Sequence, residues 1–263
     1  MSGAVAVSPY GEYVAHWLAH EPELRLAHAL VAAVREPRHE ALRVLDTLLL
    51  DAALEVRDAA VAHAKLDWWR AELAAAAAGA ARHPVARRLA ELEALDASGA
   101  ATLLDAAAGI AALESPRDLA ALREPFRSYA RASLGADAPS QRVDALGAAL
   151  LAMRLRRWPG FASASRARIP LALLAELGVA RDALLRDPRA AAGTLAALAA
   201  ALSDSVAVPP SGDPALDARL DCARHLLDAL RRAPADAIDG GTRARALPLL
   251  LALWRTARRG VAA

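Results

Sequence analysis

Prolines and glycines divide this sequence into stretches of strong helix formers, and that division limits the fold more than any other feature. The 15 prolines and 14 glycines fall mostly between segments rich in alanine, leucine, arginine and glutamate, where they mark helix ends. Alternating runs of β-branched residues bounded by turns, which predict strands, do not occur. The sequence therefore predicts an all-α fold.

The expected helices cover most of the chain. One of them contains Pro125, which predicts a kink or a break at that point. The expected ranges are residues 10–19, 22–35, 38–57, 58–78, 84–95, 100–113, 116–134, 139–157, 170–177, 180–186, 188–205, 214–232 and 242–259.

Residues 1–263 are expected to form a single helical bundle, because helical domains of this length can share one core. The segment 206–213 (VAVPPSGD) is the best candidate for a flexible linker. Hydrophobic residues make up 56% of the chain and charged residues 24%, a balance that excludes a disordered protein.

Charge and composition exclude several function classes. The net charge is only +2 and no basic run carries interleaved aromatic residues, so we expect no nucleic-acid partner. A single cysteine, Cys222, excludes an internal disulfide and a cysteine-based zinc site. No stretch approaches the roughly 20 apolar residues that span a membrane. The N-terminus lacks the pattern of a signal peptide, which predicts a cytoplasmic protein.

Three stretches, in order, resemble the squalene/phytoene synthase family. Residues 64–73 (AKLDWWRAEL) with 82–85 (RHPV) are similar to the family's K-L-x-W-W-R-x-E-L and H-P-V/L segments. Residues 155–157 (LRR) followed by 168–179 (RIPLALLAELGV) resemble its L-R stretch and G-R-x-Y-L-P segment. Residues 247–255 (LPLLLALWR) resemble its C-terminal helix. The resemblance implies the isoprenoid synthase fold, with helices packed around a central apolar cavity.

The sequence departs from that family where its chemistry is carried out. Catalytic members hold magnesium with two facing aspartate-rich motifs, and the magnesium grips the substrate diphosphate. The second motif is expected between Leu155 and Arg168, a stretch that contains no carboxylate. The aromatic residue expected before Pro170 is replaced by Ile169.

An acidic pair remains where the first motif is expected. Asp51 and Glu55 are four residues apart and would share one helix face. They are either a remnant of the motif or an ordinary solvated pair. The pattern as a whole is also similar to the branch that contains a complex I assembly factor with a phytoene-synthase-like domain.

Candidate cavity or anion-binding residues lie on two segments. On the first, Lys65, Trp68, Trp69 and Glu72 are spaced as one helix stripe. The tryptophans would face the core, with the two charged residues at its rim. Alternatively, Lys65 contacts an anion at the cavity mouth. Arg70 on the same segment is a further candidate.

Four arginines surround the place of the missing second motif: Arg156, Arg157, Arg166 and Arg168. Such a cluster would suit a phosphate or an acidic partner, because guanidinium groups pair with oxyanions. The alternative is that arginine is simply the surface cation of this chain.

Other groups favour ordinary structural roles. His16 and His20 have metal-site spacing but no evident third ligand. Asp213 is expected to cap a helix, and Asp217 to pair with an arginine on a wet helix face. Cys222 is expected to be a buried structural thiol.

The sequence thus predicts a squalene/phytoene synthase-like protein that has lost its magnesium and diphosphate motifs and acts as a non-catalytic binding or assembly module, with no metal and no cofactor. One alternative is an active farnesyl or geranylgeranyl diphosphate transferase, with magnesium as cofactor. The acids that it could use are Asp51, Glu55, Asp105 and Asp217. Another alternative is a carrier of an apolar isoprenoid or lipid.

Overall fold

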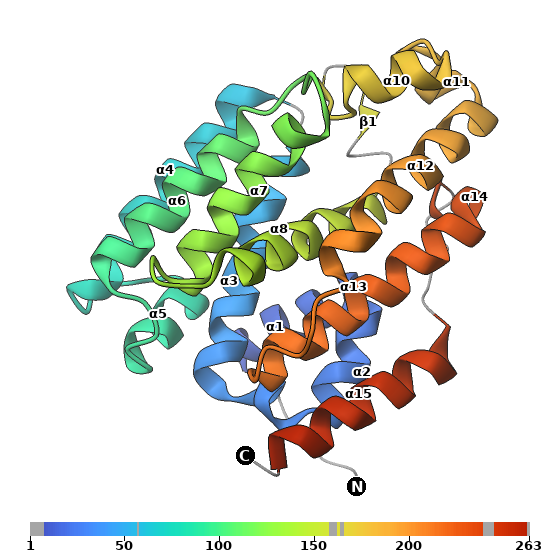
Figure 1. Cartoon of the computed structure of the whole chain (residues 1–263). Coiled ribbons are helices and arrows are strands. Elements are labelled where there is room, and N and C mark those ends of the chain that lie inside the picture. The colour runs from blue at the N-terminus through green and yellow to red at the C-terminus, as the bar shows by residue number, and fades with distance from the viewer. Residues whose placement is uncertain (1–7, 57, 158–161, 164–165, 239–244, 262–263) are drawn as a thin grey trace, which may run out of the picture.

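The computed structural model describes residues 8–56, 58–157, 162–163, 166–238 and 245–261 and is all-α (Figure 1). The helices are α1 (Pro9–His20), α2 (Pro22–Leu30), the 3-10 helix η1 (Ala32–Arg35), α3 (Pro37–Leu54), α4 (Ala59–Ala77), α5 (Pro84–Glu91), α6 (Ala97–Ala111), α7 (Leu119–Leu134), α8 (Ser140–Leu155), α10 (Leu171–Leu177), α11 (Ala183–Arg186), α12 (Pro188–Val206), α13 (Pro214–Arg232), α14 (Pro234–Ile238) and α15 (Ala246–Val261). The strands β1 (Ala162–Ser163) and β2 (Arg166–Ala167) form a two-residue antiparallel pair.

Proline and aspartate set the helix starts, as the sequence predicts. Proline occupies the first turn of α1, α2, α3, α5, α12 and α13, where its missing N–H costs nothing. Aspartate side chains cap α4, α6, α7, α12 and α13 by accepting backbone N–H groups. The expected cap at Asp213 is among them, with its carboxylate 2.9 Å from the amide nitrogen of Ala215.

Two expectations about the helices were wrong, and a third is decided in part. The expected helix over 22–35 is interrupted at Val31, whose backbone is extended. The helix α7 continues through Pro125, so the expected break does not occur there, and the alternative of a kink stays a prediction. The short helix α14 was not expected at all.

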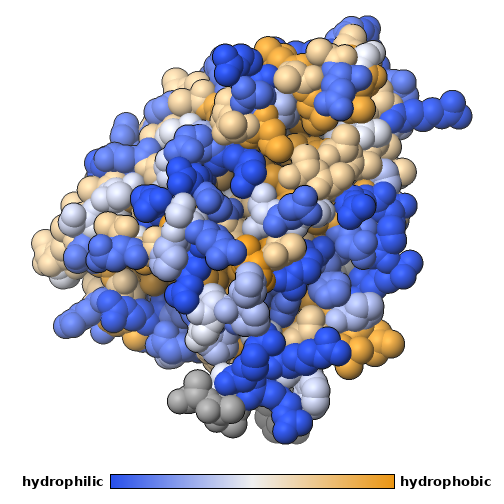
Figure 2. All heavy atoms as spheres, in the orientation of Figure 1, coloured by the Kyte–Doolittle hydropathy of each residue, from blue (hydrophilic) through white to orange (hydrophobic). Residues whose placement is uncertain are grey.

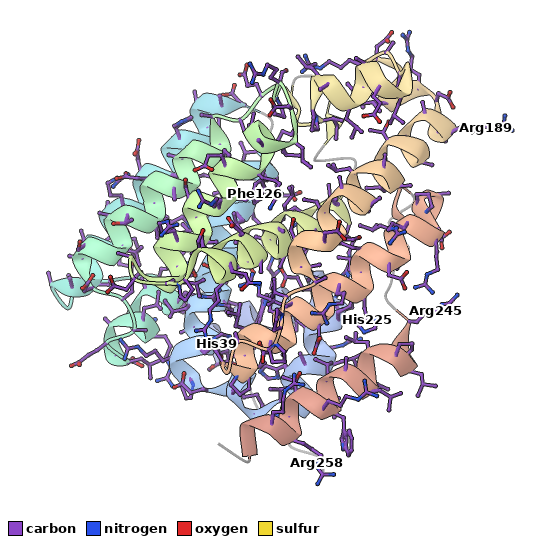
Figure 3. All side chains as sticks on the ribbon, in the orientation of Figure 1. His39, Phe126, Arg189, His225, Arg245 and Arg258 are labelled. Carbon is purple, nitrogen blue, oxygen red and sulfur yellow. The ribbon has the colours of Figure 1, made fainter. Side chains whose placement is uncertain are left out.

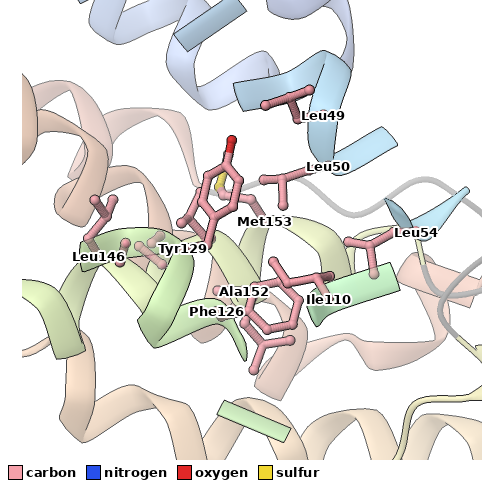
Figure 4. Packing of buried hydrophobic residues seen from close by; sticks show 14 of the residues in the cluster. Leu49, Leu50, Leu54, Ile110, Phe126, Tyr129, Leu146, Ala152 and Met153 are labelled. Atoms are coloured by element: carbon pink, nitrogen blue, oxygen red, sulfur yellow. The ribbon is translucent and has the colours of Figure 1, made fainter. Parts of the chain in front are cut away.

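The helix α8 runs through the middle of the molecule (Figure 1) and contacts α7, α12 and α13. Every residue from Ala145 to Leu155 is buried, and all of them except Arg154 are apolar, as expected of an enclosed helix. Figure 4 shows Phe126 and Tyr129 of α7 packed beside Ile110 and Met153. Large side chains therefore occupy the space next to the central helix.

A buried polar network lies within this core. The carboxylate of Asp46 accepts a hydrogen bond from the hydroxyl of Tyr129 at 2.9 Å. It also pairs with the guanidinium groups of Arg43 at 2.7 Å and Arg219 at 3.3 Å. All four side chains are nearly inaccessible to solvent, so one carboxylate on α3 joins three helices.

The candidate linker connects α12 to α13. Val206 is the last residue of α12 and is fully buried, so the connection is shorter than expected. Within it, the amide of Ser211 donates to Asp217 at 2.7 Å, and the carbonyl of Ser211 accepts from Arg142. The flexibility of this segment stays a prediction. None of the described helices is both long and apolar enough to cross a membrane.

Candidate functional site

Two helix ends meet at the candidate site. The last turn of α3 supplies Asp51, and Glu55 follows that helix directly. The last turn of α8 supplies Arg154, and Arg157 follows two residues after that helix ends. The Asp51 carboxylate lies 2.5 Å from a guanidinium nitrogen of Arg154 and 2.9 Å from one of Arg157. The same Arg157 nitrogen lies 3.2 Å from the carboxylate of Glu55. We call these four residues the acid–arginine cluster.

The cluster is shielded from solvent on its inner side. The Arg154 side chain is only 5% exposed, whereas Arg157 is 28% exposed. Burial acts to lower the pKa of Arg154, but the charges of Asp51 and Glu21 outweigh burial and raise that pKa. The guanidinium group of Arg154 is therefore held charged against Asp51.

A cavity of about 490 Å³ opens beside the acid–arginine cluster. Asp51, Glu55 and Arg157 line one wall of it. The other walls come from α1, α4 and the start of α5, and they carry ionisable and aromatic side chains: His16, His20, Lys65, Trp68, Trp69 and His83. The structure thus brings five of the residues expected from the sequence into one cavity: Asp51, Glu55, Lys65, Trp69 and Arg157.

The two tryptophans of α4 differ in burial. Trp69 is 5% exposed, as expected of a core residue, whereas Trp68 is 50% exposed, so placing both in the core was wrong. Their rings meet edge to face with centroids 5.1 Å apart, and the Trp69 ring lies 4.7 Å from that of His83. Burial lowers the pKa of His83, so the cavity has an aromatic wall that is uncharged near neutral pH.

Glu72 was expected at the rim of the core but is buried. Its carboxylate accepts the backbone N–H groups of Arg82 and His83, both at 2.5 Å. Glu72 therefore fixes the segment that leads into α5 and carries the cavity residue His83. The spacing of α4 places Glu72 on the Trp69 side of the helix, but it does not reveal these amide partners.

Lys65 and Arg70 lie in different places. Lys65 is exposed and lines the cavity, and its role as an anion contact stays a prediction. Arg70 does not line the cavity; it pairs at 2.7 Å with Asp105 of α6 on the outer surface, where the two side chains are 44% and 70% exposed. The expectation that Arg70 belongs to the cavity was wrong.

Two arginines expected at the cavity mouth are structural instead. Arg156 is buried and pairs with Glu23 of α2. Arg168 is 1% exposed and donates to the carbonyl groups of Leu54 at 3.0 Å and Leu113 at 3.2 Å. The side chain of the fourth arginine, Arg166, lies outside the described residues.

The histidine pair of α1 lies at the cavity. The rings of His16 and His20 have centroids 4.0 Å apart. Burial, and then the neighbouring His20, lowers the pKa of His16. Among the described residues, no group of three or more His, Cys, Asp or Glu side chains is placed to hold a metal ion.

A second cavity, of about 620 Å³, lies between α13, α15 and the connection that precedes α13. Its lining includes Asp217, Asp221 and His225. Asp217 is buried and accepts from the amide of Ser211, so its expected place on a wet helix face was wrong. Cys222 is buried, as expected, and burial raises the pKa of its thiol. The sequence does not reveal the cavity between α13 and α15, because these helices are brought together only by tertiary packing.

The all-helical architecture is that of squalene synthases, as expected from the sequence. The crystal structure of squalene synthase HpnC from Alicyclobacillus acidocaldarius is similar to this chain, with a TM-score of 0.53 and 21% sequence identity. The match covers 88% of this chain and 97% of the other. At this identity the similarity shows the fold alone. No protein-family model matches the sequence, and no curated protein does.

Proposed function

We propose that this chain is a squalene/phytoene synthase-like protein that has lost the magnesium and diphosphate motifs and acts as a non-catalytic binding or assembly module. The observation that carries this proposal is the acid–arginine cluster. The carboxylates that resemble a remnant of the first motif, Asp51 and Glu55, are paired with arginines of α8. An assembly role would fit the assembly-factor branch that the sequence resembles.

The residues of the site do not suit a magnesium–diphosphate complex. Magnesium requires several oxygen ligands, but the sequence between Leu155 and Arg168 contains no carboxylate. Instead Arg157 places a positive charge against Asp51 and Glu55. Two unit charges of the same sign 4 Å apart repel by about 4 kcal/mol near a protein surface, and a divalent ion would be repelled about twice as strongly. Arg157 therefore disfavours a bound cation.

The alternative of an active transferase requires acids that share one site. Asp105 lies on the outer surface in a pair with Arg70. Asp217 lines the other cavity. Of the four acids considered, only Asp51 and Glu55 line the same cavity. This separation supports the non-catalytic proposal.

The alternative of an apolar carrier is less well supported. Seven of the twelve residues that line the cavity beside the cluster are ionisable, so an isoprenoid chain there would lie against several charged or titratable groups, unlike the few polar groups of a typical apolar site. Extraction of the purified protein with organic solvent, followed by mass spectrometry, tests this alternative. A stoichiometric co-purifying isoprenoid would favour the carrier over the proposed module.

The deciding experiment is an assay of the purified protein with magnesium and farnesyl or geranylgeranyl diphosphate. We expect no condensation product. Turnover above about 1 per second, an ordinary enzyme rate, would contradict the proposal. If such turnover were lost in Asp51→Ala but kept in Asp105→Ala, the displaced-acid alternative would be correct. Calorimetric titration of the protein with inorganic diphosphate, with and without magnesium, gives a second readout. We expect no magnesium-dependent binding of diphosphate to the protein.

A further inference from the structure

The helix α15 is apolar on two opposite faces. Its inner face packs on α13 and α2, with Leu249 and Leu253 at 1% and 0% exposure. Its outer face carries Leu247, Leu251 and Trp254, which are 69%, 48% and 52% exposed. These three residues are spaced i, i+4 and i+7, so they form one stripe along the outside of the helix. Figure 2 shows apolar surface at the lower right, over the beginning of α15.

The charge of α15 has a single sign. Residues 246–261 contain three arginines and no acid. Within the described part of the chain, none of Arg255, Arg258 and Arg259 forms an ion pair, whereas many arginines elsewhere do. The Arg258 guanidinium lies over the Trp254 ring, 5.1 Å from its centroid, and points away from the body of the molecule (Figure 3).

The arginines lie at the end and along one flank of the apolar stripe. Arg258 continues the stripe by one further turn, four residues after Trp254. Arg255 and Arg259 lie to one side and line the cavity between α13 and α15. Leu251 lines the edge of the same cavity. Of the acids there, Asp221 pairs with Arg224 and accepts from Thr256, to which Arg259 donates, while Asp217 accepts the amide of Ser211 and keeps its charge. Within the described part of the chain, Arg255 and Arg258 are thus the arginines of α15 with no polar side-chain partner, and they lie beside exposed leucine and tryptophan.

We propose that the outer face of α15 docks on an anionic lipid membrane, with the helix lying in the plane of the surface. Interfacial helices combine a tryptophan- and leucine-bearing face with arginine beside it, and tryptophan prefers the headgroup level of a bilayer. Charge decides between the candidate occupants. A second copy of the chain would set three arginines against three arginines, whereas anionic headgroups attract each of them.

The test is co-sedimentation of the whole protein with vesicles of phosphatidylcholine alone and of phosphatidylcholine mixed with phosphatidylglycerol. We expect binding to the mixed vesicles that weakens as salt is added. The double variant Leu251→Gln, Trp254→Gln should lower the partition coefficient about tenfold or more, because it removes two membrane-inserted apolar side chains. The double variant Arg255→Gln, Arg258→Gln should lower it about fivefold for each charge removed.

Matched controls separate this surface from general stickiness. Leu171 and Leu185 are 45% and 51% exposed on other helices, so Leu171→Gln, Leu185→Gln should bind as the wild type does. Circular dichroism confirms that each variant is folded. The proposal is overturned if the wild-type protein does not co-sediment with the mixed vesicles. It is also overturned if the control variant loses as much binding as the α15 variants. Dimerisation or capture of an acidic protein through α15, without vesicle binding, would also overturn it.

Discussion

Replacing Asp46 with asparagine should destabilise the fold strongly. The change keeps the shape of the side chain but removes the negative charge that faces Arg43 and Arg219 in the core. Both guanidinium groups already have one buried N–H without a partner. Burial, ahead of the neighbouring charges, lowers the pKa of Arg43, which indicates how costly its charged form is in this position.

The magnitude follows from how many charges are left unpaired. Removing one partner of a buried ion pair costs about 3–5 kcal/mol. Because Asp46 serves two guanidinium groups, we expect a loss in the upper half of that range. Proteins of this kind have about 5–15 kcal/mol of stability in total. The Asp46→Asn variant would therefore lose a large share of its free energy of unfolding.

The measurement is urea unfolding followed by circular dichroism, with Asp105→Asn as the control. Asp105 also pairs with an arginine, but on the surface, where such pairs contribute about 0–1 kcal/mol. A third variant, Tyr129→Phe, removes only the 2.9 Å hydrogen bond to Asp46 and should cost about 1 kcal/mol. If Asp46→Asn costs no more than Asp105→Asn, the buried network does not stabilise the fold as described.

Two further predictions concern α4 and the pH dependence of stability. Trp69→Ala should lower the free energy of unfolding by about 3–5 kcal/mol, because Trp69 is buried. Trp68 is half-exposed and Lys65 is exposed, so Trp68→Ala and Lys65→Ala should each lower it by about 1 kcal/mol or less. Equal losses for the three variants in denaturant melts would refute the assignment of Trp69 to the buried face of α4. Burial, and then two neighbouring guanidinium groups, lowers the pKa of His39 from 6.5 to about 3. Between pH 6.5 and pH 3, His39 is therefore protonated in the unfolded chain but not in the folded one. The free energy of unfolding should then fall as the pH decreases, by about 2 kcal/mol near pH 5. His39→Gln should remove that part of the pH dependence in urea melts, and an unchanged pH profile would contradict the assigned cause.

The helices were predictable because their determinants are local. Proline at a helix start and aspartate before it act within one turn, so the bounds of α13 follow from the sequence. The interruption at Val31 was not predicted, because helix propensity and proline positions do not reveal how the end of α2 is closed: the guanidinium group of Arg35 donates to the carbonyls of His28 and Ala29. Tertiary packing decides the case of Pro125, since contact of α7 with α8 supports a helix that continues through the proline.

The site was predictable only in part. The four-residue spacing of Asp51 and Glu55 places both carboxylates at one cavity, and this periodicity can be read directly. The partners of Arg156 and Arg157 cannot be predicted from spacing, because the two residues are adjacent in sequence and their side chains point in different directions. Arg156 turns to Glu23 while Arg157 turns to Asp51. The sequence does contain one indication of the cluster. Arg154 lies in an otherwise apolar run, which predicts that it is buried, and a buried arginine requires an acidic partner.

The negative charge at the end of α3 is balanced by arginine side chains. A helix C-terminus carries partial negative charge, and Asp51 and Glu55 add two carboxylates there. Arg154 and Arg157 neutralise the carboxylates, and Arg168 binds the carbonyl groups of Ala53 and Leu54. Three arginine side chains thus balance the negative charge at this helix end. Within the described part of the chain, Lys65 is the cation of the cavity that forms no ion pair. A ligand of this cavity would therefore be selected mainly by the tryptophan and histidine rings, with Lys65 as its charged contact.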